Sequence, residues 1–154
     1  MANAIFYQNN AGFKINTTGS TYVDLTDHVT SITINRTFDE LDVTAMGAGG
    51  HAFIAGLEAS SISIDFLNDD SAGQVMSVLN GLVGVVAPFK IVQTATAIGA
   101  LTSAATVSAT NPLYTGSILV NKITPVAGKV GDIAVQTLTF TVSGAMTVAT
   151  TGTW

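Results

Sequence analysis

The residues best suited to chemistry lie near the middle of the chain, where an acidic cluster is followed by glycines and a histidine. Carboxylates and an imidazole beside flexible glycines can hold a divalent cation, and a glycine-rich loop can bind phosphate. The same composition suits a mobile arm that one subunit extends to another. The residues are Asp39, Glu40 and Asp42, the glycine-rich stretch Gly47 to Gly50, and His51.

The spacing favours the arm over either kind of site. The glycines match neither G-x-G-x-x-G nor a P-loop ending in Lys-Ser or Lys-Thr, and a strand-like pattern follows them instead of a helix. A calcium loop needs closely spaced oxygens around a fixed glycine turn, and zinc needs three or four ligands at preferred spacings. Because the acidic cluster and its distant histidine match neither pattern, we expect no metal and no other cofactor.

Few other residues are candidates for catalysis. Asp65, Asp69 and Asp70 form a second acidic patch, which we interpret as lying at the start of a helix rather than as an acid/base pair. The chain has no cysteine and no G-x-S-x-G elbow, and its histidines are His28 and His51. The sequence therefore indicates a protein that is not an enzyme. A bound metal, or an activity that is lost on mutating His51 and Asp42, would argue against this.

The composition predicts a single domain, residues 1–154, with little charge. Of 154 residues, 47% are hydrophobic and 10% are charged, and the net charge is −5. Globular proteins carry roughly a quarter charged residues, so we expect much of this surface to be covered by other subunits or to be polar through Thr, Ser and Asn. The five cations are scattered and give no basic footprint for nucleic acid.

No segment predicts membrane insertion. The N-terminus, MANAIFYQNN, lacks the basic region and apolar core of a signal peptide. The longest uncharged run, residues 91–121, is rich in Thr, Ser and Gly and contains Pro112, whereas a membrane helix needs about 20 mostly apolar residues. We expect no membrane partner.

Alternating and β-branched patterns predict many short strands. Thr137, Thr139 and Thr141 alternate with apolar residues, which is typical of a half-buried antiparallel strand with a hydroxyl-rich outer face. Residues 39–57 are expected to be a long inter-strand loop, and residues 95–113 an insertion or a weak hairpin. The predicted strands cover 13–18, 21–26, 29–38, 60–67, 85–94, 116–124 and 133–143.

One short amphipathic helix is expected over about residues 70–83. Asp70 and Ser71 supply capping oxygens, and Gln74 follows Ser71 at the spacing of a capping box. The predicted fold is therefore mainly β, a β-sandwich or barrel of antiparallel strands with this helix packed against it.

Several motifs follow one another in an order that is itself informative. They are DLTDHV before TSITINRTF, then ELDVT, AGLEASSISIDF and NDDSAGQVMSVL, and later YTGSILVNKIT and TLTFTVSG. This order resembles the major tail proteins of long-tailed bacteriophages, which are the subunits of the tail tube. The similarity covers nearly the whole chain except residues 95–113, and it is carried by the order of the motifs rather than by any one of them.

The resemblance implies a subunit that closes into hexameric rings, which stack into the hollow tube through which DNA is ejected. The long loop would be an arm that reaches a neighbouring subunit or the next ring. Its implied partners are further copies of the chain, and tape measure, tip and terminator proteins of the tail. The protein would belong to the virion after assembly in the host cytoplasm. The arm contacts would come from Phe38, Asp39, Glu40, Asp42, Met46, Gly49, Phe53, Ile54 and Leu57.

Double-stranded DNA would pass through such a tube without specific binding. Duplex DNA carries one charge per roughly 1.7 Å, so an acidic or hydroxyl-rich wall would let it slide. Thr137, Thr139 and Thr141 are therefore candidates for the lumen-facing surface, and the predicted strand 116–124 is a second one. Lys122 and Lys129 count against a lumen position for their own segments, since a lysine there would attract phosphate.

A β-sandwich that decorates a capsid or serves in adhesion is the alternative function. Such a binding module would expose an aromatic or basic patch for its target, whereas Tyr7, Tyr22 and Tyr114 are spread along the chain.

Overall fold

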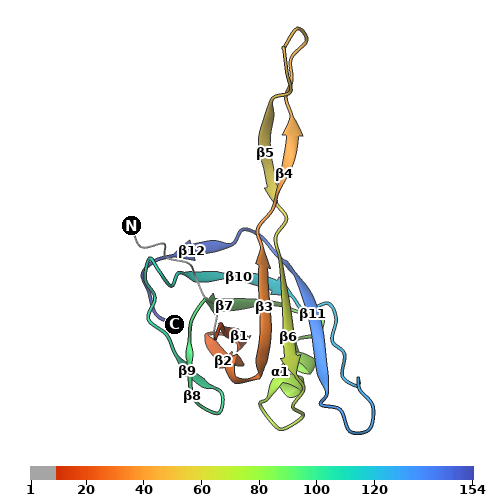
Figure 1. The fold of residues 1–154 in the computed structure, drawn as a ribbon, viewed down its shortest axis with the longest axis vertical. Helices are drawn as coiled ribbons and strands as arrows, with labels where there is room; N and C mark the ends of the chain where they lie inside the picture. The colour runs from red at the N-terminus through yellow and green to blue at the C-terminus, as the bar shows by residue number, and fades with distance from the viewer. Residues whose placement is uncertain (1–9) are drawn as a thin grey trace.

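A computed structural model describes residues 10–154 (Figure 1), and the N-terminal stretch in which we expected no signal peptide lies mostly outside this range. The strands are β1 (Gly12–Thr18), β2 (Thr21–Asp24), β3 (Val29–Asn35), β4 (Phe38–Asp42), β5 (Phe53–Glu58), β6 (Ser61–Leu67), β7 (Val86–Val92), β8 (Thr96–Gly99), β9 (Thr102–Ala104), β10 (Leu113–Leu119), β11 (Val135–Val142) and β12 (Thr147–Ala149). A short 3-10 turn, η1 (Thr26–His28), and one helix, α1 (Val75–Leu82), complete the described elements.

Eight strands form one antiparallel sheet that folds over on itself. Their order is β2-β1-β7-β10-β11-β6-β3, and β12 pairs with β10. The corner lies between β10 and β11, which share only the pairs Ile118–Val142 and Leu119–Thr141. In Figure 1, β3, β6 and β11 run along the long axis of the molecule while β7 and β10 run across them. The two layers thus form the predicted β-sandwich, and the mainly β fold class is confirmed.

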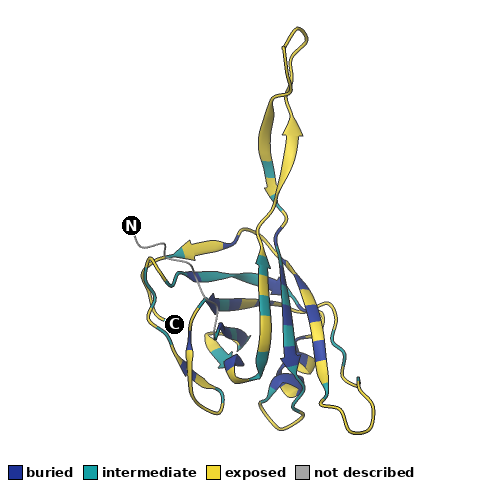
Figure 2. Cartoon of the chain, in the orientation of Figure 1, coloured by how far each residue is buried: buried dark blue, intermediate teal, exposed yellow. Residues whose placement is uncertain are grey.

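The core fills the space between the two layers. Phe13 and Phe66 lie with their ring centroids 5.8 Å apart, and both are fully buried with Phe89 and Phe140. Strands β6 and β11 bury every second residue, which Figure 2 shows as alternating colours along each arrow. Burying one such side chain contributes about 1.5–3 kcal/mol, so these strands supply much of the stability of the fold.

The helix begins at Val75 rather than at about residue 70, and Asp70 and Ser71 do not cap it. The N-cap residue is Gln74, and it makes no side-chain capping bond. Asp69 accepts a hydrogen bond from the Ser71 N–H at 2.8 Å, a local turn that competes with helix formation. Gly73 then adopts a left-handed conformation, φ +80°, which a right-handed helix cannot contain. From Val75 onward the helix packs against the core as predicted.

Residues 39–57 differ from the expected irregular loop. Strands β4 and β5 form a separate antiparallel hairpin, and Figures 1 and 2 show it projecting from the body with nearly all of its residues exposed. Cross-strand pairs such as Leu41–Ile54 and Asp42–Phe53 build the ladder. The flexible glycines occupy its tip, where Gly47 has a φ of +89°. We call residues 38–58 the arm.

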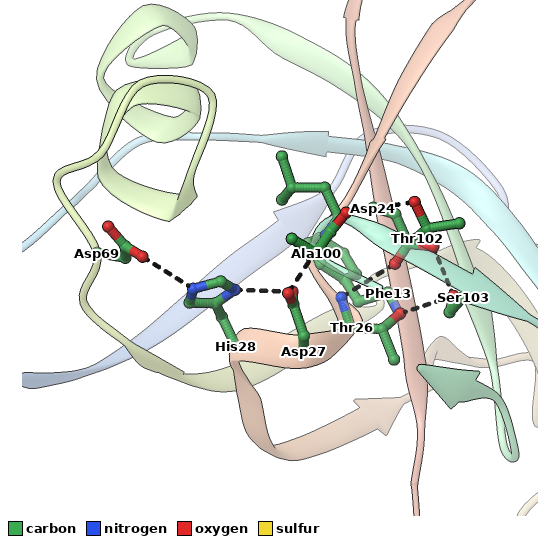
Figure 3. Close-up of polar contacts among 10 residues, drawn as sticks. Phe13, Asp24, Thr26, Asp27, His28, Asp69, Ala100, Thr102 and Ser103 are labelled. Atoms are coloured by element: carbon green, nitrogen blue, oxygen red, sulfur yellow. Dashed lines mark hydrogen bonds and ion pairs between the residues drawn. The ribbon is translucent and has the colours of Figure 1, made fainter. Parts of the chain in front are cut away.

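Part of the segment 95–113 forms the short hairpin β8–β9. A buried polar cluster holds it against the body (Figure 3). The Ser103 hydroxyl donates to the Asp24 carboxylate and lies 3.3 Å from the Thr26 hydroxyl, while the indole N–H of the C-terminal Trp154 donates to Ser103 at 2.9 Å. Nearby, His28 lies between the carboxylates of Asp27 and Asp69, at 2.7 and 3.3 Å.

The packing of β11 generates the first prediction. Phe140→Ala should lower the free energy of unfolding by about 3–5 kcal/mol, because it leaves a cavity between the layers. Thr137→Val keeps a β-branched side chain on the exposed face of the same strand and should change it by less than about 0.5 kcal/mol. Urea unfolding of dilute protein measures both, and equal effects would contradict the observed orientation of β11.

Candidate assembly surfaces

The arm exposes apolar side chains on both faces of its ladder. Leu41 and Ile54 pair on one face and are 50% and 53% exposed, whereas Phe53 pairs with Asp42 on the other and is 57% exposed. An isolated two-stranded hairpin is only marginally stable in water, and soluble monomers rarely expose contiguous apolar surface. The arm therefore has the composition of a segment that another molecule covers.

The remaining predicted arm residues lie toward its ends. Phe38 and Leu57 are exposed near the root, and Met46 is fully exposed at the tip. Gly49 also lies at the tip, where an added Cβ would meet no atom within 4 Å. Their roles as contact residues stay predictions.

The candidate ligands of the acidic cluster are only partly brought together. The Asp42 carboxylate accepts hydrogen bonds from Thr44 and lies 3.1 Å from Nδ1 of His51, and its pKa is lowered chiefly by the Thr44 hydroxyl. Asp39 and Glu40 do not join this group. Within residues 10–154, no three side chains of metal-ligating type gather at one point. The Asp42–His51 contact closes the ladder near the arm tip, and this is its evident structural role.

An ion pair fixes the root of the arm. Nε and Nη2 of Arg36 donate to the two carboxylate oxygens of Glu58, at 3.1 and 3.2 Å. Nη2 also donates to the Met146 carbonyl at 3.2 Å. Ser60 donates to the same carboxylate at 2.6 Å. These donors, Arg36 first, lower the pKa of Glu58 to about 2. The sequence analysis did not identify Glu58 as a functional residue, although it lies inside the motif AGLEASS.

The predicted hydroxyl face exists and extends over three strands. Thr137, Thr139 and Thr141 are exposed on β11, and Thr139 lies 3.1 Å from the Ser63 hydroxyl of β6. The backbone register continues this face across β6 and β3, and Asp65 is its one charged residue. The three cross-strand rows are Thr137–Asp65–Ser31, Thr139–Ser63–Thr33 and Thr141–Ser61–Asn35.

The two outer strands of the three that carry this face, β3 and β11, also have unpaired edges. Among the described residues, β3 has a ladder partner only in β6. Residues 135–140 of β11 likewise pair only with β6, because β10 reaches β11 only at Thr141 and Val142. Free edges of this kind are a liability in a monomer and are ready to pair with another chain.

A comparison with solved structures finds a chain of similar fold in the tail of a particle. The match is to a chain in the structure described as the tail of an empty GTA particle, computed with helical refinement and C6 symmetry. It covers 88% of this chain and 92% of that chain with a TM-score of 0.64 and 19% sequence identity. The shared feature at this identity is the fold. No family model matches the sequence, and no curated protein matches it either.

No helix within residues 10–154 is long and apolar enough to cross a bilayer.

The Arg36–Glu58 pair generates the second prediction. Because the pKa of Glu58 is lowered from 4.5 to about 2 in the folded protein, its stabilising effect is fully present above about pH 4.5 and is lost as pH falls toward 2. Glu58→Gln should therefore lower Tm at pH 7, and the difference from the unmodified protein should shrink between pH 4.5 and 2. Thermal unfolding followed by circular dichroism measures this.

Asp70→Asn is the matched control, since Asp70 is exposed and makes no ion pair within the described residues. It should shift Tm little at any pH. A Glu58→Gln difference that stayed constant from pH 7 to 2 would contradict the assignment of this carboxylate as the titrating group.

Proposed function

We propose that this protein is a structural subunit of a phage-type tail tube, which assembles into hexameric rings that stack into a hollow tube. The observation that carries the proposal is the arm, a thin hairpin with apolar residues exposed on both faces, on a fold shared with a C6-symmetric tail. Because nothing within residues 10–154 covers these side chains, other copies of the chain are the simplest partner.

Ring closure would use the free edges of the three-stranded layer. Strands β3 and β11 are both antiparallel to β6, so they run in the same direction within one copy. A rotation about an axis along the strands preserves that direction, and β3 of one copy would then meet residues 135–140 of β11 in the next as parallel strands. This contact is heterologous, and repeated rotation closes it into a ring.

The hydroxyl face would then line the lumen. In this arrangement Thr137, Thr139 and Thr141 point toward the tube axis, with Asp65 as the one charge per copy on the face. Such a wall has no cations to hold phosphates, so double-stranded DNA would pass during ejection without specific binding. In the tail of a virion assembled in the host cytoplasm, the tube would further contact tape measure, tip and terminator proteins.

Electron microscopy tests this proposal. Concentrated purified protein should form rings or tubes, whereas Leu41→Ser with Ile54→Ser should abolish them and leave the β circular dichroism spectrum unchanged, because these residues lie on the arm outside the core. The matched control is the double variant Thr137→Val with Thr141→Val, which also changes two residues but on the proposed lumen face. This variant should still form tubes.

Protein that stays monomeric under all salt conditions would contradict the proposal. Stoichiometric binding to a capsid or a glycan without self-assembly would favour a decoration or adhesion module instead.

A further inference from the structure

His28 joins two segments that lie far apart in the sequence. Its ring lies between two carboxylates, with Nδ1 2.7 Å from Asp27 in the same turn and Nε2 3.3 Å from Asp69, which follows β6 (Figure 3). The His28 side chain is 15% exposed, so water reaches it only in part. The contact with Asp69 therefore ties the η1 turn to the stretch of chain that leads into α1.

These two contacts make a definite demand on the protons of the ring. An ionised carboxylate only accepts hydrogen bonds, so each ring nitrogen must carry a proton to bond its partner. An imidazolium has two N–H groups and satisfies both carboxylates, whereas a neutral imidazole has one N–H and leaves a lone pair facing the other carboxylate. Both contacts of His28 are therefore hydrogen bonds only when the ring is protonated.

The two contacts differ in how readily they are given up. The contact with Asp27 is the shorter, and it joins adjacent residues, so it orders no distant segment. A neutral ring that keeps this bond has its proton on Nδ1 and turns the lone pair of Nε2 toward Asp69. Because facing lone pairs repel, the long-range contact with Asp69 is the one that opens.

Asp69 keeps its charge over the range in which histidines titrate. Hydrogen bonds from Ser71, with a smaller contribution from His28, hold the pKa of Asp69 below its usual value of 3.8. Histidine changes its charge between about pH 5 and 8. The charge on the ring, rather than the charge on Asp69, is therefore what changes near neutral pH.

No other charged side chain joins this contact within residues 10–154. Of the strands packed against η1, β1 contributes Lys14, which lies 3.6 Å from Asp24 instead, and β9 has no titratable residue. Asp70 is exposed and forms no ion pair. The protonation of one ring thus decides whether the contact forms.

The tip of the β8–β9 hairpin depends on both sides of the contact. Leu101 has a φ of +54°, the one positive φ outside glycine among the described residues, and such a conformation persists only where contacts hold it. The Leu101 N–H donates to Asp27 at 3.3 Å. Its side chain packs on the core and reaches the helix entry, where a Cβ added to Gly73 would lie 3.8 Å away.

We propose that His28 is a pH-sensitive clamp, which holds the entry of α1 against η1 while its ring is protonated and releases it when the ring is neutral. Release also loosens the packing of Leu101 between the two, so the tip of β8–β9 responds to the same proton. The clamp lies within one chain and involves no neighbouring copy. It therefore stands or fails independently of the tail-tube function.

Nuclear magnetic resonance of the dilute, unassembled protein tests the clamp. The chemical shifts of the His28 ring nitrogens should show protons on both in acid, and loss of the Nε2 proton alone as the pH rises. The backbone amide shifts of Gly73 and Leu101 should change with the same midpoint. Loss of the Nδ1 proton instead, or amides that do not follow the ring, would overturn the proposal.

Asp69→Asn is the variant that removes the charge and keeps the shape. An asparagine amide has both a donor and an acceptor, so it can bond the ring in either protonation state. The pH response of the Gly73 and Leu101 amides should therefore be lost, while the circular dichroism spectrum stays that of the folded protein. An equal response in this variant would contradict the clamp.

Two controls should keep the response. Asp70→Asn removes the neighbouring carboxylate, which is exposed and unpaired within residues 10–154. His51→Gln removes the other histidine of the chain, which contacts Asp42 in the arm. Loss of the response in His51→Gln would assign it to the arm and overturn the role of His28.

Discussion

The strict two-residue alternation of β6 and β11 is the constraint on which the rest of the structure depends. It sends Ile64 and Leu138 into the core and their neighbours Ser63 and Thr139 to the opposite face. A slip of one residue would exchange the two faces and bury hydroxyls without partners, so burial fixes the register strongly. The core, the hydroxyl face and the position of both free edges follow from this single register.

The arm depends on the same layer, because it continues two of its strands. Strand β3 leads into β4, and β5 leads back into β6, so the direction of the arm is set where the chain leaves the sheet. At that point the two-pronged contact of Arg36 with Glu58 ties the two strands together and holds the β11–β12 turn through Met146. A charge-assisted pair with two parallel hydrogen bonds fixes geometry as well as distance. An exposed hairpin is thereby mounted on a rigid base.

Sequence patterns predicted those parts of the fold that local periodicity determines. The alternation of Thr137, Thr139 and Thr141 was confirmed, and the fold implied by the order of motifs is shared with a chain of a solved tail structure. The helix start was wrong because the capping residues enter a local turn before Gly73. The arm was expected to be a loop because its glycines and acidic residues conceal a ladder of only a few pairs.

Other features escaped prediction because they depend on residues far apart in the sequence. Ser103 contacts Asp24 across 79 positions, and no local pattern could indicate that contact or the packing of β8–β9 that it supports. The choice of Glu58 as the partner of Arg36 is likewise decided by how β3 and β6 lie side by side.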